Sequence, residues 1–186
     1  YLRYSLSQAL CVGGLIVLVF SAPAIFVRAW GGSMTHFIIM QCAGVVCFII
    51  ASNSTSYFVD RFGAEKVIWL GTFISMIAAL LILLYALSGG QEPLVVAALF
   101  APLNLALGIR GPPGFLRAII AGGGQDDRAS SLLVLALFAA VAGGTAILAP
   151  FVEHGMVETA LAVFLMELGA VGLLVWLPGL PDKLAS

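Results

Sequence analysis

Long apolar stretches alternate with short polar segments along the whole chain. Six such stretches cover residues 6–27, 33–58, 67–87, 93–116, 129–151 and 157–177. Because about 20 apolar residues in a helix cross the hydrocarbon layer of a bilayer, each stretch predicts a membrane-spanning helix. The separators are short and rich in glycine and charged residues, which is typical of turns. The pattern predicts an all-α membrane protein with one six-helix domain over residues 1–186, in which consecutive helices are antiparallel.

The composition supports a membrane protein and excludes several functions. The chain is 62% hydrophobic and 9% charged, whereas a soluble domain is about 25% charged. Its mean hydropathy is +1.14. A net charge of −1 gives no basis for binding nucleic acid. The three cysteines lie in apolar stretches without the spacing of metal ligands, so we expect buried thiols, no metal and no cofactor.

Basic residues near the ends of the stretches predict the orientation in the membrane. If the N-terminus is cytoplasmic, the residues on the cytoplasmic side are Arg3, Arg61, Lys66, Arg117, Arg128 and Lys183. Arg28 alone then lies outside, and Arg110 lies within a span. We therefore expect both termini in the cytoplasm and a multi-pass protein of the cytoplasmic (inner) membrane.

The segment between the second and third stretches, "DRFGAEK", concentrates charge in one turn. A basic cytoplasmic loop explains Arg61 and Lys66, but it does not explain Asp60 at the end of the span. Gly63 permits a tight reversal because it can adopt positive φ. Asp60 can pair with Arg61 or Lys66, or face the N-terminal end of a neighbouring helix. Contacts of this kind favour a latch that forms in one conformation and breaks in another.

The D-R-x-G of this turn, formed by Asp60, Arg61 and Gly63, resembles the loop signature of the major facilitator superfamily between its second and third spans. The fuller signature, G-x-L-a-D-R-x-G-R-K, is only half present. The departures are Ser56, Phe58, Ala64 and Glu65. In that family the loop helps to lock the cytoplasmic gate, so the resemblance implies a gate loop here.

Two further segments resemble the same family. In "IRGPPG", Arg110 precedes Gly114 by four residues, as in the R-x-x-x-G pattern of the family's fourth span. "GGTAILAPF", residues 143–151, is similar to the fifth-span signature of its antiporters, although the Gly-Pro dipeptide is missing. The resemblance implies two inverted three-helix repeats, which make one half of a twelve-span transporter. The chain is then a half-size member that pairs with a second copy, or half of a longer chain.

Polar residues inside the spans are the candidates for substrate binding and proton coupling. Arg110 either lines a cavity or extends toward the inner headgroups, and the cavity is favoured because buried charges usually have a function. Glu167 is either a proton site or a structural hydrogen-bonding group. Asn104 and Gln41 can contact substrate, although hydrogen bonds between helices are the commoner role. Helix breaks or hinges are expected at Gly111, Pro112, Pro113, Gly114 and Pro150.

Small residues mark places where helices can approach closely. The candidates for contact within a dimer are Gly44, Cys47, Ala140, Gly143 and Gly144. Packing inside the six-helix unit is the alternative use of the same residues.

The leading hypothesis is a half-size secondary active transporter that works as a homodimer. Its largely apolar spans favour a small lipophilic or amphiphilic solute, moved by alternating access, and Arg110 and Glu167 suggest proton coupling. The alternative is a non-autonomous half, as a fragment or accessory subunit without transport of its own. The expected partners are a second six-helix half, the bilayer and the solute. A membrane enzyme is disfavoured, because the spaced carboxylates of a D-x-x-D-G metal site are absent.

Overall fold

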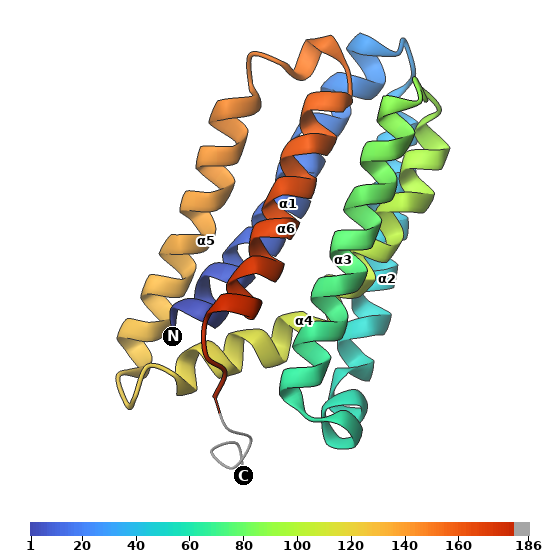
Figure 1. Ribbon diagram of the computed structural model, residues 1–186. Coiled ribbons are helices and arrows are strands. Elements are labelled where there is room, and N and C mark those ends of the chain that lie inside the picture. Colours follow the sequence, from blue (N-terminus) through green and yellow to red (C-terminus); the bar gives the residue numbers. More distant parts are fainter. Residues whose placement is uncertain (181–186) are drawn as a thin grey trace.

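Each of the six predicted stretches forms a long helix in the computed structural model, which describes residues 1–180 (Figure 1). The helices are α1 (Leu2–Ala24), α2 (Met34–Phe62), α3 (Ala64–Leu87), α4 (Pro93–Ile120), α5 (Asp126–Leu148) and α6 (Val157–Trp176). Two short helical turns, η1 (Ile25–Ala29) and η2 (Val152–His154), follow α1 and α5. All six α-helices are long and apolar enough to cross a membrane, which confirms the prediction of an all-helical chain with six helices of that length and is compatible with a multi-pass membrane protein. Lys183 lies outside the described residues.

The connection between α2 and α3 is a single residue, Gly63. Its φ of +84° lies in a region that glycine adopts without the steric cost imposed by a Cβ atom. The carbonyl of Val59 accepts a hydrogen bond from the Gly63 amide at 2.8 Å. The tight reversal expected from the sequence is therefore present, and both helices extend further into the charged segment than the apolar pattern indicates.

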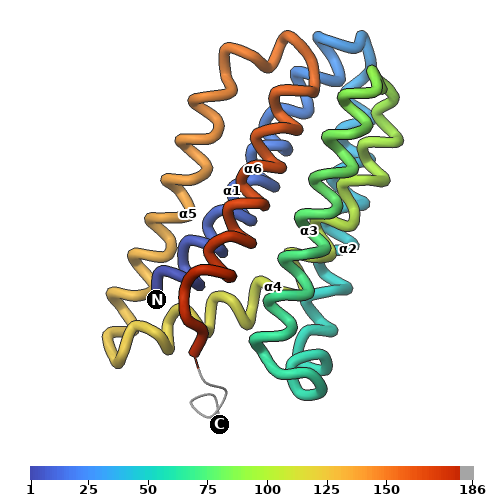
Figure 2. The backbone as a smooth tube through the Cα atoms, in the orientation of Figure 1, coloured from blue at the N-terminus to red at the C-terminus, as the bar shows by residue number. Residues whose placement is uncertain are grey.

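Two groups of helices meet through a central contact. α1 packs against α5 and α6, α4 packs against α2 and α3, and α3 contacts α6. α1 and α4 also contact each other. We call the end of the bundle where α1 begins and α6 ends the terminal end. It lies at the bottom of Figures 1 and 2, where the last turns of α4 cross beneath the bundle toward the start of α5.

The sequence-based expectation of a broken helix at Gly111–Gly114 needs correction. α4 remains helical from Pro93 to Ile120, with Pro112 and Pro113 inside it. A proline inside a helix removes a backbone hydrogen bond and kinks the helix. Figure 1 accordingly shows α4 bending sharply, so that its last third runs across the bundle. The prolines redirect the chain without interrupting the helix.

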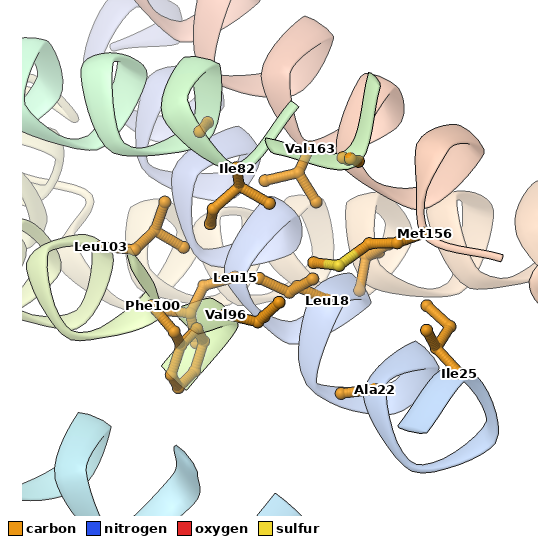
Figure 3. Packing of buried hydrophobic residues seen from close by; sticks show 14 of the residues in the cluster. Leu15, Leu18, Ala22, Ile25, Ile82, Val96, Phe100, Leu103, Met156 and Val163 are labelled. Carbon is orange, nitrogen blue, oxygen red and sulfur yellow. The ribbon is translucent and has the colours of Figure 1, made fainter. Parts of the chain in front are cut away.

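The interior changes character along the bundle. Away from the terminal end, one apolar core joins α1, α3, α4 and α6 (Figure 3). The residues labelled there are Leu15, Leu18, Ala22, Ile25, Ile82, Val96, Phe100, Leu103, Met156 and Val163. Nearer the terminal end the apolar clusters are smaller, and charged side chains lie between them.

The contact between α2 and α4 depends on Gly108. A Cβ atom added there would lie 2.6 Å from the Phe48 carbonyl oxygen and 2.8 Å from the Ala51 Cβ atom. Both neighbours belong to α2, and the first is a backbone atom, so neither can move without displacing the helix. Gly108 therefore sets the distance between these two helices.

We expect Gly108→Ala to lower the free energy of unfolding by about 1–3 kcal/mol, the usual cost of overpacking. The matched control is Gly172→Ala in α6, where an added Cβ meets no atom within 4 Å. That control should be neutral or slightly stabilising, because alanine favours helix over glycine. Thermal unfolding of the purified variants in detergent measures both effects. Equal shifts of the two midpoints would contradict the assigned role of Gly108.

Candidate functional site

A cluster of polar side chains lies wholly inside the bundle, where four helices meet. We call it the buried polar cluster, and its members are Ser7, Gln8 and Cys11 from α1, Ser75 from α3, Arg110 from α4 and Glu167 from α6. Each is at most 4% exposed. Arg110 and Glu167 have no exposed surface at all. The structure thus brings together the two charged residues that the sequence singled out.

Arg110 is anchored to the first turns of α1. Its Nη1 atom donates a hydrogen bond to the Ser7 carbonyl oxygen, and its Nη2 atom donates to the Ser7 hydroxyl, each at 3.1 Å. Gly71 of α3 provides room for the side chain, because a Cβ there would lie 2.5 Å from the Arg110 Cβ atom. Arg110 Nε is buried without a hydrogen-bond partner. The guanidinium therefore ties α4 to α1 and leaves one buried donor, Nε, without a hydrogen bond.

Glu167, on α6, contacts α1 within the same cluster. Its Oε2 atom accepts a hydrogen bond from the Cys11 thiol at 3.0 Å. Its Oε1 atom is buried without a hydrogen-bond partner and lies next to Gly14, 3.6 Å from where a Cβ would be. Arg110 and Ser75 are the other polar groups that act on the carboxylate. Glu167 is thus buried inside the bundle, where its carboxylate contacts α1.

The R-x-x-x-G spacing in α4 has a clear packing role. Arg110 binds Ser7, and Gly114, one helical turn later, lies against the neighbouring Gln8. A Cβ on Gly114 would approach the Gln8 Oε1 atom to 2.8 Å. The motif thus combines a charged anchor with a gap that admits a second polar side chain from α1.

The remaining candidates for substrate contact lie elsewhere. Asn104 is buried, and its side-chain amide donates to the Phe100 carbonyl of its own helix at 3.1 Å. It packs near Gly44 at the contact between α2 and α4. Gln41 is half-buried on α2. The structure does not bring either residue into the buried polar cluster.

The predicted gate loop is largely exposed. Asp60, Arg61 and Lys66 face outward, and Arg61 Nη1 donates to the Tyr57 hydroxyl at 3.0 Å. Asp60 lines a pocket of about 390 Å³ between α2 and the bent part of α4, together with Pro112 and Pro113. Among residues 1–180, Asp60 forms no ion pair with Arg61 or Lys66.

At the terminal end, the carboxylate of Glu65 makes several polar contacts with other helices. From the sequence, Glu65 is only a departure from the loop signature. Glu65 Oε1 forms a salt bridge with Arg3, and Oε2 lies 3.9 Å from Arg117 Nη1. The Tyr4 hydroxyl lies 2.8 Å from the same Oε2 atom. The Leu180 amide donates to the Tyr4 hydroxyl at 2.8 Å. We call this set of residues the terminal network.

The terminal network joins α1, α3, α4, the end of α6 and the segment that follows it. Arg3 also donates to the carbonyls of Leu174 and Leu177, and Arg117 donates to that of Leu180 at 2.9 Å. One signal in the sequence predicts its position. Arg117 follows Arg110 by seven residues, and Ser7 follows Arg3 by four, so each pair shares a helix face.

The small residues proposed for dimer contacts have mixed positions. Gly44 contacts Phe100, and Gly144 contacts Val17, both within the bundle. Ala140 packs on α1 next to Gly13. Cys47 is half-buried, whereas Gly143 is exposed and an added Cβ there would meet no atom within 4 Å. Gly143 therefore keeps a free face.

Pro150 lies exposed just after α5.

No family model, curated protein or solved structure matches the chain. The chemistry of the site therefore has to be argued from the residues themselves. A guanidinium and a carboxylate share an interior without solvent, and a thiol and hydroxyls surround them. Such a group of residues can hold or release a proton, or it can fix the relative positions of the helices that contribute it.

We expect Glu65→Gln to lower the free energy of unfolding by about 1–3 kcal/mol, because the buried Arg3 loses its charged partner. Glu92→Gln is the matched control, since Glu92 is exposed at the start of α4 on the opposite end of the bundle. Thermal unfolding in detergent compares the two variants. If Glu65→Gln unfolds at the same temperature as the control, the terminal network does not stabilise the bundle.

Proposed function

We propose that the chain is one six-helix half of a secondary active transporter of major-facilitator type. It acts together with a second six-helix half, most simply a second copy of itself. The pair moves a small lipophilic or amphiphilic solute across the cytoplasmic membrane by alternating access, coupled to protons. The terminal end faces the cytoplasm, because the basic residues near the span ends gather there.

One observation carries the proposal, namely the pattern of helix contacts. α1 packs on α5 and α6, as α4 packs on α2 and α3. If α1, α2 and α3 are exchanged in order with α4, α5 and α6, the contacts of α1 with α5 and α6 become those of α4 with α2 and α3. The α3–α6 and α1–α4 contacts each map onto themselves. Since α1 and α4 run in opposite directions (Figure 1), the exchange inverts the unit. This is the relationship expected between two inverted three-helix repeats of a transporter.

The exposed surface supports a second half. α2 and α5 are the least buried of the six helices, and they occupy equivalent places under the exchange described above. Their exposed residues are mainly apolar, as the outward side chains Val45, Ile49, Leu135 and Phe138 illustrate. We assign the contact with the second half to this surface, and Gly143 is the small residue that remains available there.

The buried charges support a role in coupling. A charged residue inside a span is costly and is usually retained for a function. Because Arg110 and Glu167 have no exposed surface, we assign them to proton coupling within the half and not to direct contact with the solute. Gln41 on the partly exposed face of α2 stays the better candidate for solute contact.

The native mass of the purified chain in lipid nanodiscs is the first test of this proposal. We expect a dimer, because a single half supplies only one wall of a path between two halves. The mass is measured by native mass spectrometry at several protein-to-lipid ratios, and a dimer that persists on dilution supports the proposal. A stable monomer at every ratio contradicts the homodimer and favours an accessory half that needs a different partner chain.

Arg110→Ala is expected to reduce transport at least about tenfold, the factor that corresponds to about 1.4 kcal/mol in an activation barrier. The measurement is proton-driven movement of a lipophilic fluorescent dye, ethidium, in proteoliposomes. Arg128→Ala, at an exposed position in the first turn of α5, is the control and should transport normally.

Arg110→Lys separates charge from geometry, because lysine keeps the charge but not the two-pronged contact with Ser7. We expect it to fold and to transport at an intermediate rate. Normal transport by folded Arg110→Ala would show that Arg110 has no part in coupling.

A further inference from the structure

The hydrogen bond between Cys11 and Glu167 is the one polar contact of the buried polar cluster that joins α1 to α6. The thiol lies 3.0 Å from Glu167 Oε2, and the two residues are 2% and 0% exposed. The other carboxylate oxygen, Oε1, is buried without a hydrogen-bond partner, as is Arg110 Nε. A carboxylate with a free buried oxygen can accept a proton there.

The strength of a thiol hydrogen bond depends on the charge of its acceptor. A thiol is a weak donor, and hydrogen bonds to an ionised carboxylate are shorter and about twice as strong as those to a neutral group. When Glu167 takes up a proton, its carboxylate becomes a neutral acid and the Cys11 contact weakens. When Glu167 releases the proton, the contact strengthens again.

Few other groups influence this pair. Arg110 faces it from α4, and α3 contributes the uncharged hydroxyl of Ser75. The charged residues of α5 are Asp126, Asp127 and Arg128, which lie in its exposed first turn. Within residues 1–180, Arg110 is therefore the one neighbouring fixed charge, and Glu167 and Cys11 are the titratable groups in contact.

We propose that Cys11 and Glu167 form a proton-binding pair, in which Cys11 is a positioning residue that holds α1 to α6 when Glu167 is ionised and loosens this contact when Glu167 is protonated. One proton is added to or removed from the carboxylate, and no oxidation or reduction occurs. The role of this pair in transport rests on the proposed function above, but proton binding by the pair can be tested without a transport assay.

The test follows the S–H stretching band of Cys11 by infrared spectroscopy, because the frequency falls as the thiol donates a stronger hydrogen bond. Cys42→Ala and Cys47→Ala remove the two thiols of α2, which lie outside the cluster, so that one thiol remains. Spectra of the purified full chain are recorded across a pH series. We expect the band to move to higher frequency as the pH falls and Glu167 becomes protonated.

Three further variants assign the band and its shift. Cys11→Ala should remove the band, and Glu167→Gln should hold it near the low-pH position at every pH. Glu158→Gln changes a carboxylate in the first turn of α6 and should leave the pH dependence of the band unchanged. If Glu167→Gln does not fold, Glu167→Asp replaces it, because the shorter side chain draws the carboxylate away from the thiol and should shift the band at high pH.

The outcomes separate this proposal from the proposed function. A band that does not move with pH, or that still moves in Glu167→Gln, overturns the proton-binding pair. A band that titrates and is fixed by Glu167→Gln supports it. If the band titrates but Cys11→Ala and Glu167→Gln leave the pH dependence of ethidium transport unchanged, the pair stands and its role in coupling fails.

Discussion

The burial of Arg110 is the constraint on which the rest of the interior depends. A guanidinium without solvent has to find acceptors and countercharge inside the protein, since an unpaired buried charge is strongly destabilising. Here α1 provides the carbonyl and hydroxyl of Ser7 as acceptors, and the carboxylate of Glu167 on α6 lies in the same buried cluster. Gly71 and Gly114 lack side chains where the Cβ of Arg110 and the side chain of Gln8 need space. The charge thus dictates residues on four helices.

The same constraint explains why the two ends of the interior differ. Away from the terminal end, α1, α3, α4 and α6 pack through leucine, valine, isoleucine and phenylalanine, which need only complementary shape (Figure 3). At the cluster, directional hydrogen bonds with defined geometry join α1 to α4 and α1 to α6. A movement of α1 against α4 or α6 would therefore break specific contacts at the cluster, whereas the apolar core can adjust by repacking.

Much of the fold was predictable from the sequence, because hydrophobic length and turn chemistry are local properties. The six helices and the reversal at Gly63 follow from residue patterns alone, and the same patterns single out Arg110 and Glu167 as charged residues inside spans. The partners of these residues do not, because contacts between helices depend on rotation about each helix axis. The sequence predicts only that Cys11 is a buried thiol, and nothing adjacent in sequence indicates that it faces Glu167.

The bend of α4 and the role of Glu65 were harder to predict, for a different reason. Two consecutive prolines indicate a disturbed helix, but whether the helix stops or bends depends on what receives the chain beyond them. In this protein Arg117, beyond the bend, reaches the terminal network around Glu65. Pro112 and Pro113 cannot donate to the carbonyls of Gly108 and Ile109, one turn earlier. The Thr55 hydroxyl of α2 donates to the Gly108 carbonyl at 3.0 Å instead, so that this carbonyl keeps a partner although the helix bends.

The buried polar cluster and the terminal network are connected through the same two helices. On α1, Arg3 belongs to the network, whereas Ser7 and Cys11, at successive turns, belong to the cluster. On α4, Arg117 and Arg110 have the same relationship, two turns apart. A rigid shift of α1 against α4 therefore has to alter both sets of contacts together. In the proposed transporter, a shift of α1 that accompanies protonation of Glu167 would therefore change the terminal network as well.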